Sequence, residues 1–323
     1  MNPYLTKFRE EEAANGRSPE DIQKMVDIMT ESSLAYPANG VKRRIDDICN
    51  GSYRSIKWPW KALTAMAPCL NPGAVTVVVG GPGAGKSFFL LQCLNHWIRS
   101  GIDACAYMLE GNRSDHLHRL LAQLDENSNL FDLEWIEENP KEAEEALERH
   151  FAWMNVVGHQ IEVAPLGSLT YDDVVDWITY KAREGKRVIC VDPITAARKL
   201  APPWIADEQI LGQMKSVADR YKMSIVFVTH PTKEYADPAL SSISGGAAVE
   251  RFIDGALWLQ KIESKDVTVR GACGRHEAKI DRILHLLKVR NGRGGGYKIG
   301  FQFDPTCLML AEQGVLLKEK SNG

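Results

Sequence analysis

The sequence lacks any pattern of paired cysteines. Its seven cysteines are scattered along 323 residues without a C-x-x-C pair, and its eight histidines do not cluster. Because a disulfide framework or a tetrahedral zinc site requires such spacing, neither is predicted. We therefore expect the protein to work in a reducing compartment, which is the cytoplasm, or the mitochondrial matrix or nucleoid if the source is an organelle.

Long hydrophobic runs are also missing. No stretch approaches the roughly 18 apolar residues that a membrane helix requires. The first residues are charged and contain no hydrophobic region of the kind found in secretory signals. We expect no membrane partner and no export.

An excess of charge of one sign is lacking as well. The chain has 39 Lys and Arg against 42 Asp and Glu, which gives a net charge of −3. The molecule as a whole therefore does not attract polyanions, and a nucleic acid would have to bind a local surface. Residues 125–148 hold ten of the acidic side chains, and we expect them to form the solvated face of surface helices.

The first 56 residues are polar and helical in character. Ser18 is expected to cap a helix that begins at Pro19. The apolar residues of that helix share one stripe: Ile22, Met25, Val26 and Met29. Such a stripe packs either on its own domain or on a neighbouring subunit. We assign residues 1–56 to an N-terminal helical extension or linker that is a candidate inter-subunit contact.

From residue 70 onward, short β-branched runs alternate with longer helical stretches. This alternation predicts an α/β fold in which helices flank a mostly parallel central sheet. The runs expected as strands are 74–79, 104–109, 160–164, 187–191, 224–229, 255–260, 283–289 and 297–303. A glycine-rich loop separates the last two, which predicts a C-terminal β-hairpin. We expect the charged stretch 264–281 to be a surface insertion, and we assign no further role to it.

A phosphate-binding signature lies between the first of these strands and a helical stretch. The residues that fit G-x-x-x-x-G-K-[ST] are Gly80, Gly81, Pro82, Gly83, Ala84, Gly85, Lys86 and Ser87. Glycines allow successive backbone N–H groups to wrap a phosphate, and the helix N-terminus adds a favourable dipole. Lys86 would reach the β- and γ-phosphates, and the Ser87 hydroxyl would bind Mg²⁺. We therefore predict ATP and Mg²⁺ as cofactors.

Two carboxylates stand at the ends of later strands. Asp192 follows four apolar residues and suits the Walker B role, in which an aspartate helps to hold Mg²⁺. Glu110 follows the strand after the phosphate loop, and in a RecA-like sheet it would act as general base on the attacking water. The alternatives are a turn residue before Pro193 and an ordinary surface glutamate.

A third strand end carries His230. This side chain could hydrogen-bond the γ-phosphate and report its loss to the following loop, although a histidine in such a place is often a packing residue. The loop contains Lys233 and then Ser244, Gly245 and Gly246. Small residues let backbone amides approach DNA phosphates, so we predict DNA contact there. The alternative is a mobile lid without a ligand.

Taken together, these motifs resemble the RecA-like hexameric replicative helicases, of the DnaB and Twinkle type and the small plasmid RepA type. The resemblance covers about residues 57–312 and includes Lys288 and Arg290, near the C-terminus. It implies a RecA-like P-loop NTPase core with residues 57–323 as the motor domain. It also implies that Lys288 and Arg290 act in trans on the nucleotide of the adjacent subunit.

The predicted function is that of an ATP-dependent DNA helicase. We expect a homo-oligomeric ring, a hexamer, that translocates on single-stranded DNA in replication and has a primase or loader as a further partner. The alternative is a RecA- or KaiC-like ATPase that serves as a recombination mediator, loader or switch without processive unwinding. DnaB relatives have glutamine in place of His230, so the histidine is closer to the RepA arrangement.

Overall fold

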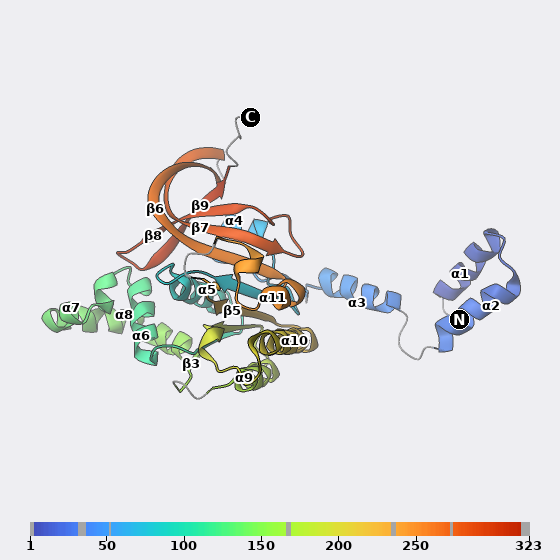
Figure 1. Cartoon of the computed structure of the whole chain (residues 1–323), viewed down its shortest axis with the longest axis horizontal. Helices are drawn as coiled ribbons and strands as arrows, with labels where there is room; N and C mark the ends of the chain where they lie inside the picture. The colour runs from blue at the N-terminus through green and yellow to red at the C-terminus, as the bar shows by residue number, and fades with distance from the viewer. Residues whose placement is uncertain are drawn as a thin grey trace. The chain divides into compact units, whose positions relative to one another are not determined.

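The computed structural model describes residues 3–31, 37–51, 53–165, 169–233, 237–271 and 274–317. The chain divides into two units, Met1–Arg54 and Ser55–Gly323. The helices of the first unit are α1 (Pro3–Ala14), α2 (Pro19–Glu31) and α3 (Pro37–Cys49). The elements of the second unit form a sheet with helices on both of its faces (Figure 1).

Within the first unit, α1 lies against α2. The backbone N–H of Asp21 donates to the Ser18 side chain at 3.1 Å, so α2 begins at the expected serine cap. Ile22 and Val26 are buried and Met25 is half-buried, while the side chain of Met29 lies outside the described part of the chain. The described part of the apolar stripe is therefore covered within the chain itself.

The second unit is built on a sheet with the strand order β3-β2-β4-β5-β1-β6-β7-β8-β9. The strands are β1 (Val75–Val79), β2 (Ala104–Met108), β3 (Ile161–Val163), β4 (Val188–Asp192), β5 (Ser224–Thr229), β6 (Gly255–Gly271), β7 (Gly274–Val289), β8 (Lys298–Asp304) and β9 (Met309–Leu316). Strands from β3 to β6 in this order pair in parallel, and those from β6 to β9 pair antiparallel. The predicted α/β fold with a mostly parallel sheet and a C-terminal hairpin is confirmed.

Side chains of the central strands alternate between two buried layers. Val75, Val77 and Val79 face one core, and Val78 faces the other. Because both faces are covered, these strands are apolar throughout, as parallel strands usually are. The covering helices are α4 (Lys61–Met66), α5 (Lys86–Arg99), α6 (Arg113–Leu124) and α8 (Pro140–Gly158) on one face, and α9 (Tyr171–Arg183), α10 (Pro203–Tyr221) and α11 (Gly246–Phe252) on the other. No helix in the described ranges is both long and apolar enough to cross a membrane.

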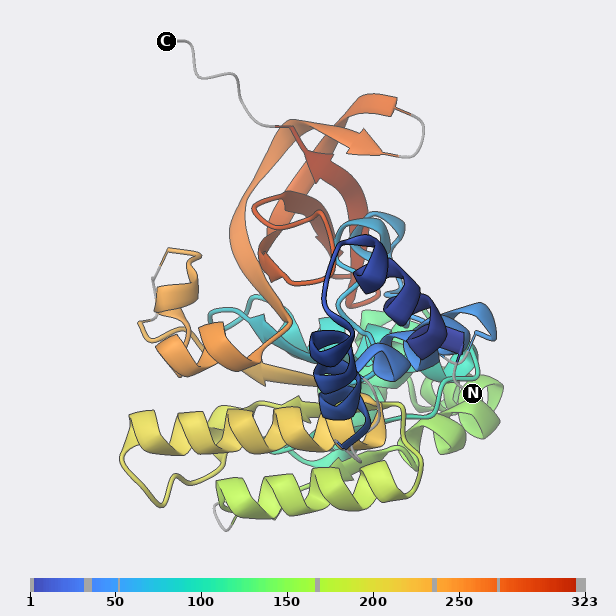
Figure 2. The same ribbon diagram turned by 90° about the vertical axis from the view of Figure 1, so that its right-hand side faces the viewer.

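The C-terminal strands differ from the expectation in length and number. β6 extends to Gly271 and β7 begins at Gly274, so residues 264–271 and 274–281 of the stretch without an assignment form most of the far half of a long antiparallel ribbon (orange in Figures 1 and 2). β9 was not predicted. It pairs with β8 and also with Val269 and Arg270 of β6, so the ribbon curls back on its neighbours. The surface insertion expected at 264–281 is therefore part of the sheet.

The acidic segment 125–148 runs from the end of α6 through α7 (Leu133–Glu138) into α8. Its acidic side chains are exposed, except for Asp125, which is half-buried. Asp125 accepts a hydrogen bond from Arg149 at 2.8 Å. The segment is a solvated helical surface, as expected.

Candidate active site

The predicted phosphate loop connects β1 to α5. Gly85 has a φ of +101°, in the left-handed region that favours glycine, and it caps α5. At Gly80 a Cβ atom would come within 2.6 Å of the Leu259 backbone oxygen, so the loop passes β6 too closely for a side chain. A glycine-rich loop that leads into the N-terminus of a helix is the arrangement in which backbone N–H groups can bind a phosphate.

Lys86 is buried and folds back onto its own loop. Its ammonium group donates to the backbone oxygens of Gly80 at 2.8 Å and Gly81 at 3.0 Å. Burial lowers the pKa of Lys86, and the negative charges of Asp192 and Glu110 oppose that lowering. A phosphate oxygen carries negative charge and the two carbonyl oxygens do not, so the Lys86 ammonium group would form stronger hydrogen bonds with a phosphate and is placed to exchange one set of partners for the other.

Asp192 ends β4 and is only 4% exposed. Burial raises the pKa of this carboxyl group to about 6, while a hydrogen bond from the Ser87 hydroxyl and the positive charge of Lys86 act in the opposite direction. A hydroxyl and a carboxylate are oxygen ligands of the kind that Mg²⁺ takes, so the pair fits that ion. Within the described ranges no group of three or more His, Cys, Asp or Glu side chains could hold a metal. Phosphate oxygens and water would therefore have to complete the coordination of the ion.

Glu110 follows β2 and its side chain is exposed. Its backbone oxygen lies 3.0 Å from Nε2 of His116, a residue of α6 that is 4% exposed. Because a carbonyl oxygen only accepts, Nε2 of His116 must donate in this hydrogen bond. Burial lowers the pKa of His116, which keeps the ring neutral at pH 7. His116 thus fixes the backbone from which the Glu110 carboxylate extends.

His230 is half-buried at the end of β5. Burial lowers its pKa, the positive charge of Lys86 lowers it further, and the negative charge of Glu110 acts the other way. The lowered pKa favours the neutral ring, in which one nitrogen can donate and the other can accept.

The sheet brings these predicted residues to one edge. In the order β2-β4-β5-β1 the strands are parallel, so their carboxyl ends meet. Glu110 follows β2, Asp192 ends β4 and His230 follows β5, while the phosphate loop follows β1. Ligands of open parallel sheets bind beyond the carboxyl ends of the strands, which is where these groups lie.

The segment after His230 is folded rather than extended. Pro231 and Ile243 form a β-bridge, and the predicted DNA contact Lys233 is exposed, while residues 234–236 lie outside the described ranges. The predicted contacts Ser244, Gly245 and Gly246 are half-buried at the start of α11.

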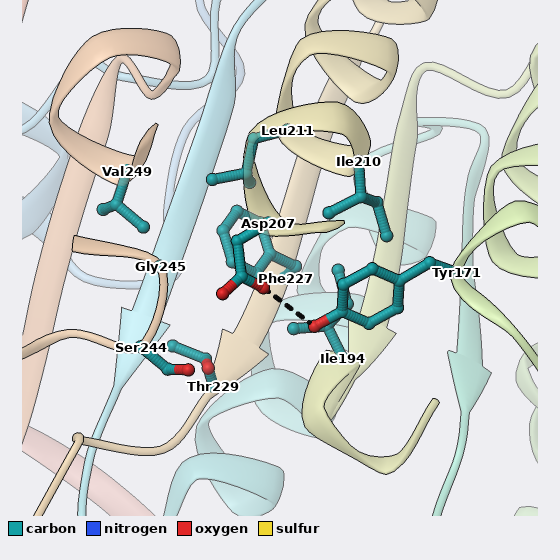
Figure 3. Close-up of a pocket in the computed structure, with 10 residues that line it drawn as sticks. All are labelled: Tyr171, Ile194, Asp207, Ile210, Leu211, Phe227, Thr229, Ser244, Gly245 and Val249. Carbon is teal, nitrogen blue, oxygen red and sulfur yellow. Dashed lines mark hydrogen bonds between the residues drawn. The ribbon is translucent and has the colours of Figure 1, made fainter. Parts of the chain in front are cut away.

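A small pocket lies beside this turn. Ser244 and Gly245 line it together with Thr229 of β5 and with Asp207, whose carboxylate accepts from the Tyr171 hydroxyl at 3.2 Å (Figure 3). Lys199 also pairs with Asp207, at 2.8 Å. The start of α11 therefore rests on a buried polar group of α10.

Lys288 and Arg290 are not brought to the phosphate loop. Val289 pairs with Gly255, which pairs with Thr76 near the amino end of β1. The phosphate loop follows the other end of β1, about 13 Å further along at roughly 3.3 Å per residue. The two cations therefore lie at the opposite edge of the sheet from their own chain's phosphate loop.

Two residues near the site were missed by the sequence analysis. His116 supports the Glu110 backbone, as described above. Arg282 of β7 is 5% exposed, and its Nε donates to the backbone oxygen of Ala84 in the phosphate loop at 3.0 Å. The sequence shows only that Arg282 is a cation directly before the apolar run 283–289, and that pattern does not point to the phosphate loop.

Comparisons with known proteins agree with this geometry. A family model described as an AAA domain matches residues 54–236, which is more than half of the chain. The search of curated proteins gives no match. Among solved structures, the ATPase domain of G40P has a TM-score of 0.66 at 13% identity, over 85% of this chain and 97% of that one. A DnaB-like replicative helicase, in a structure titled for its interactions with primase, has a TM-score of 0.65 at 13% identity, over 95% and 75%.

The similarity to these two solved structures tests the fold that the motifs predicted. The chain has the RecA-like fold of the ATPase domains of DnaB-like replicative helicases, so the predicted resemblance is confirmed at the level of the fold. The matched range 54–236 contains the phosphate loop, Glu110, Asp192 and His230.

Proposed function

Because the chain belongs to the AAA domain family, we propose that it hydrolyses ATP and works as a ring-forming DNA helicase. One observation carries the proposal: the predicted residues separate into two groups at opposite edges of the sheet. The phosphate loop, Glu110, Asp192 and His230 lie at one edge, and Lys288 and Arg290 lie at the other. Such a subunit has a nucleotide-binding site at one edge of its sheet and, at the other edge, cations that can reach the nucleotide of a neighbouring subunit.

In the proposed reaction, the loop and Lys86 bind the phosphates of ATP. Mg²⁺, when bound to Ser87 and Asp192, would neutralise charge on the phosphate oxygens. The Glu110 carboxylate accepts a proton from the attacking water, and His116 keeps the Glu110 backbone in place for this step. His230 hydrogen-bonds the terminal phosphate and loses that partner when phosphate leaves.

The second group completes the site of the adjacent subunit. Lys288 and Arg290 would stabilise the negative charge that develops on the transferred phosphoryl group. Since each chain contributes only half of a site, hydrolysis depends on assembly, and a closed ring leaves no half-site unused. We propose a hexamer, in line with the resemblance found in the motifs.

Single-stranded DNA is the proposed substrate of the motor. His230 leads directly into the loop that contains Lys233 and ends at Ser244–Gly246, so a change at the nucleotide reaches this loop through the backbone. A contact through one exposed lysine and backbone amides is compatible with a net charge of −3. The DnaB-like helicase among the solved structures interacts with primase, and we propose a primase or loader as a partner here too.

The test is strand displacement on a forked duplex, together with the rate of ATP hydrolysis with and without single-stranded DNA. We expect DNA-stimulated hydrolysis and displacement by the wild-type protein, and neither by Lys86→Ala. A protein that hydrolyses ATP but leaves the fork paired would instead be a mediator, loader or switch. A monomeric protein whose ATP hydrolysis DNA does not stimulate would contradict the proposal.

A further inference from the structure

Arg290 is held by a buried carboxylate that no motif includes. Nη1 of Arg290 lies 3.2 Å from Oδ1 of Asp254, and the Arg290 backbone N–H donates to the Asp254 backbone oxygen at 2.8 Å. The Asp254 side chain is only 6% exposed, whereas that of Arg290 is 44% exposed. The guanidinium group is therefore tied on its inner side and open to solvent on its outer side.

Asp254 itself is fixed to the sheet. Its Oδ2 accepts from the backbone N–H of Val75 at 3.0 Å and from Lys215 of α10 at 2.9 Å. Its own backbone N–H donates to the Val75 oxygen at 2.7 Å. Because Val75 begins β1, the carboxylate has a set position relative to the strand that leads to the phosphate loop.

The C-terminus of α11 supplies the other partners of the two cations. Nη2 of Arg290 donates to the Arg251 backbone oxygen at 3.1 Å, and Lys288 donates to the Glu250 backbone oxygen. Carbonyl groups at the end of a helix carry partial negative charge, which favours cations there. The same helix begins at Gly246, in the turn beside the pocket of Figure 3.

We propose that Asp254 is a positioning residue for Arg290, which it holds in the orientation that the adjacent subunit's nucleotide site requires. This inference rests on the proposed function, in which Arg290 acts in trans.

The geometry explains how Asp254 can orient Arg290 without disabling it. A guanidinium group has five N–H donors in one plane. The contacts with Asp254 and Arg251 use two of them, and the remaining donors are available to a phosphate. Two fixed acceptors on one side define the plane and direction of the group, which a long side chain in solvent would not keep.

The experiment compares Asp254→Asn with the matched control Asp219→Asn. Asp219 also pairs with Lys215, at 3.6 Å, but its hydrogen bonds and ion pairs in the described structure do not include Arg290. We expect Asp254→Asn to lower kcat for ATP hydrolysis by about 10- to 100-fold, as misplacement of a catalytic group does. Nucleotide affinity, measured with a fluorescent ATP analogue, should be unchanged because the phosphate loop lies at the other edge. Asp219→Asn should match the wild type in both measurements.

Mixed assemblies separate positioning from a general loss of structure. Lys86→Ala subunits lack a working phosphate loop but keep a normal Asp254 and Arg290. Mixing them with Asp254→Asn subunits should restore hydrolysis, because a Lys86→Ala neighbour then supplies a correctly held Arg290. If mixing fails to restore hydrolysis, the loss lies in the Asp254→Asn subunit's own site, and the proposal is overturned. Wild-type kcat in Asp254→Asn would also overturn it.

A second variant covers the case in which Asp254→Asn does not fold. Asp254→Glu keeps the charge beside Lys215 but displaces the carboxylate by one methylene group, so we expect a lower kcat that mixing again restores. Wild-type kcat in Asp254→Glu, where Asp254→Asn is unfolded, would overturn the proposal.

The variant Arg290→Ala distinguishes failure of the positioning role from failure of the proposed function. If Arg290→Ala hydrolyses ATP normally, the trans role itself is wrong; if it does not and Asp254→Asn does, only the positioning role is wrong.

Discussion

Asp192 combines a position in the proposed nucleotide site with an energetic cost. Its carboxyl group is buried, and its pKa is raised from the ordinary value of 3.8 to about 6. The folded protein therefore binds this proton more readily than the unfolded chain does between those two pH values. By linkage, the free energy of unfolding falls as pH rises through this window, and the cost at neutral pH is at most about 3 kcal/mol.

We predict that Asp192→Asn raises the Tm at pH 8, in buffer without nucleotide or Mg²⁺, and abolishes ATP hydrolysis. The gain in Tm should shrink at pH 5, because the wild-type carboxyl group is then largely protonated in the folded protein. Thermal denaturation at both pH values measures this. The matched control is Glu110→Gln, an exposed carboxylate of the same site, which should stop hydrolysis without raising the Tm. A lower Tm for Asp192→Asn at pH 8 would contradict the prediction.

Residues whose position in the candidate site depends on the local chain could be predicted from the sequence, and those whose position depends on strand register could not. Lys86 and Ser87 belong to a contiguous signature, and Asp192 ends an apolar run, so spacing alone indicates them. Arg282 is different, because only the pairing of β7 with β6 places its side chain under Ala84 of the phosphate loop. A single sequence contains no sign of that register.

Among the elements, the β6–β7 ribbon was the least predictable. Its near half is buried and apolar, and there the runs 255–260 and 283–289 were recognised. In its far half, at residues 261–271 and 274–279, most side chains are exposed, with Val269 and Ala278 buried. Alternation of apolar and polar residues is confined there to two short runs, 266–270 and 277–281, with two apolar residues each, so the periodicity that predicts strands is weak.

The exposed face of α3 leads to a prediction at the same scale. Val41, Ile45 and Ile48 are 61%, 54% and 53% exposed, and their spacing places them on one side of the helix. If residues 1–56 contact a neighbouring subunit, as proposed from the sequence, burial of these side chains would contribute to assembly. Replacing all three with Ser should then weaken assembly by at least about tenfold, since each buried aliphatic side chain is worth about 1.5–3 kcal/mol.

Sedimentation with an ATP analogue and Mg²⁺ measures that assembly, and Asp46→Ser on the same helix is the control. The Tm of the triple variant should equal that of the wild type, because the replaced side chains are already exposed in the single chain. Assembly at the wild-type concentration by the triple variant would exclude this face of α3 from the contact.

For the molecule as a whole, the function proposed above, in which Lys288 and Arg290 act on a neighbour's nucleotide, would make hydrolysis a property of the assembly. In a lone subunit Lys288 and Arg290 lie away from the chain's own phosphate loop, so we expect its turnover to be low. We predict that ATP hydrolysis per subunit rises with protein concentration and levels off where assembly is complete. Turnover assays alongside a mass measurement check this, and Arg290→Ala should assemble yet stay slow at every concentration. A rate of ATP hydrolysis per subunit that does not change with dilution would contradict the prediction.

The order of strands in the sheet also limits how copies of the chain can join. An open sheet edge presents unpaired backbone groups to which a strand of another molecule can add, and this is a common route to aggregation. Here the outermost strand on one side of the sheet is β3, which is only three residues long. The outermost strand on the other side, β9, turns back to pair with β6. The described sheet thus offers little template for a foreign strand. Copies held close together would contact one another through helices and loops rather than through strand addition. Contacts of that kind can dissociate, whereas a growing β-sheet does not readily do so.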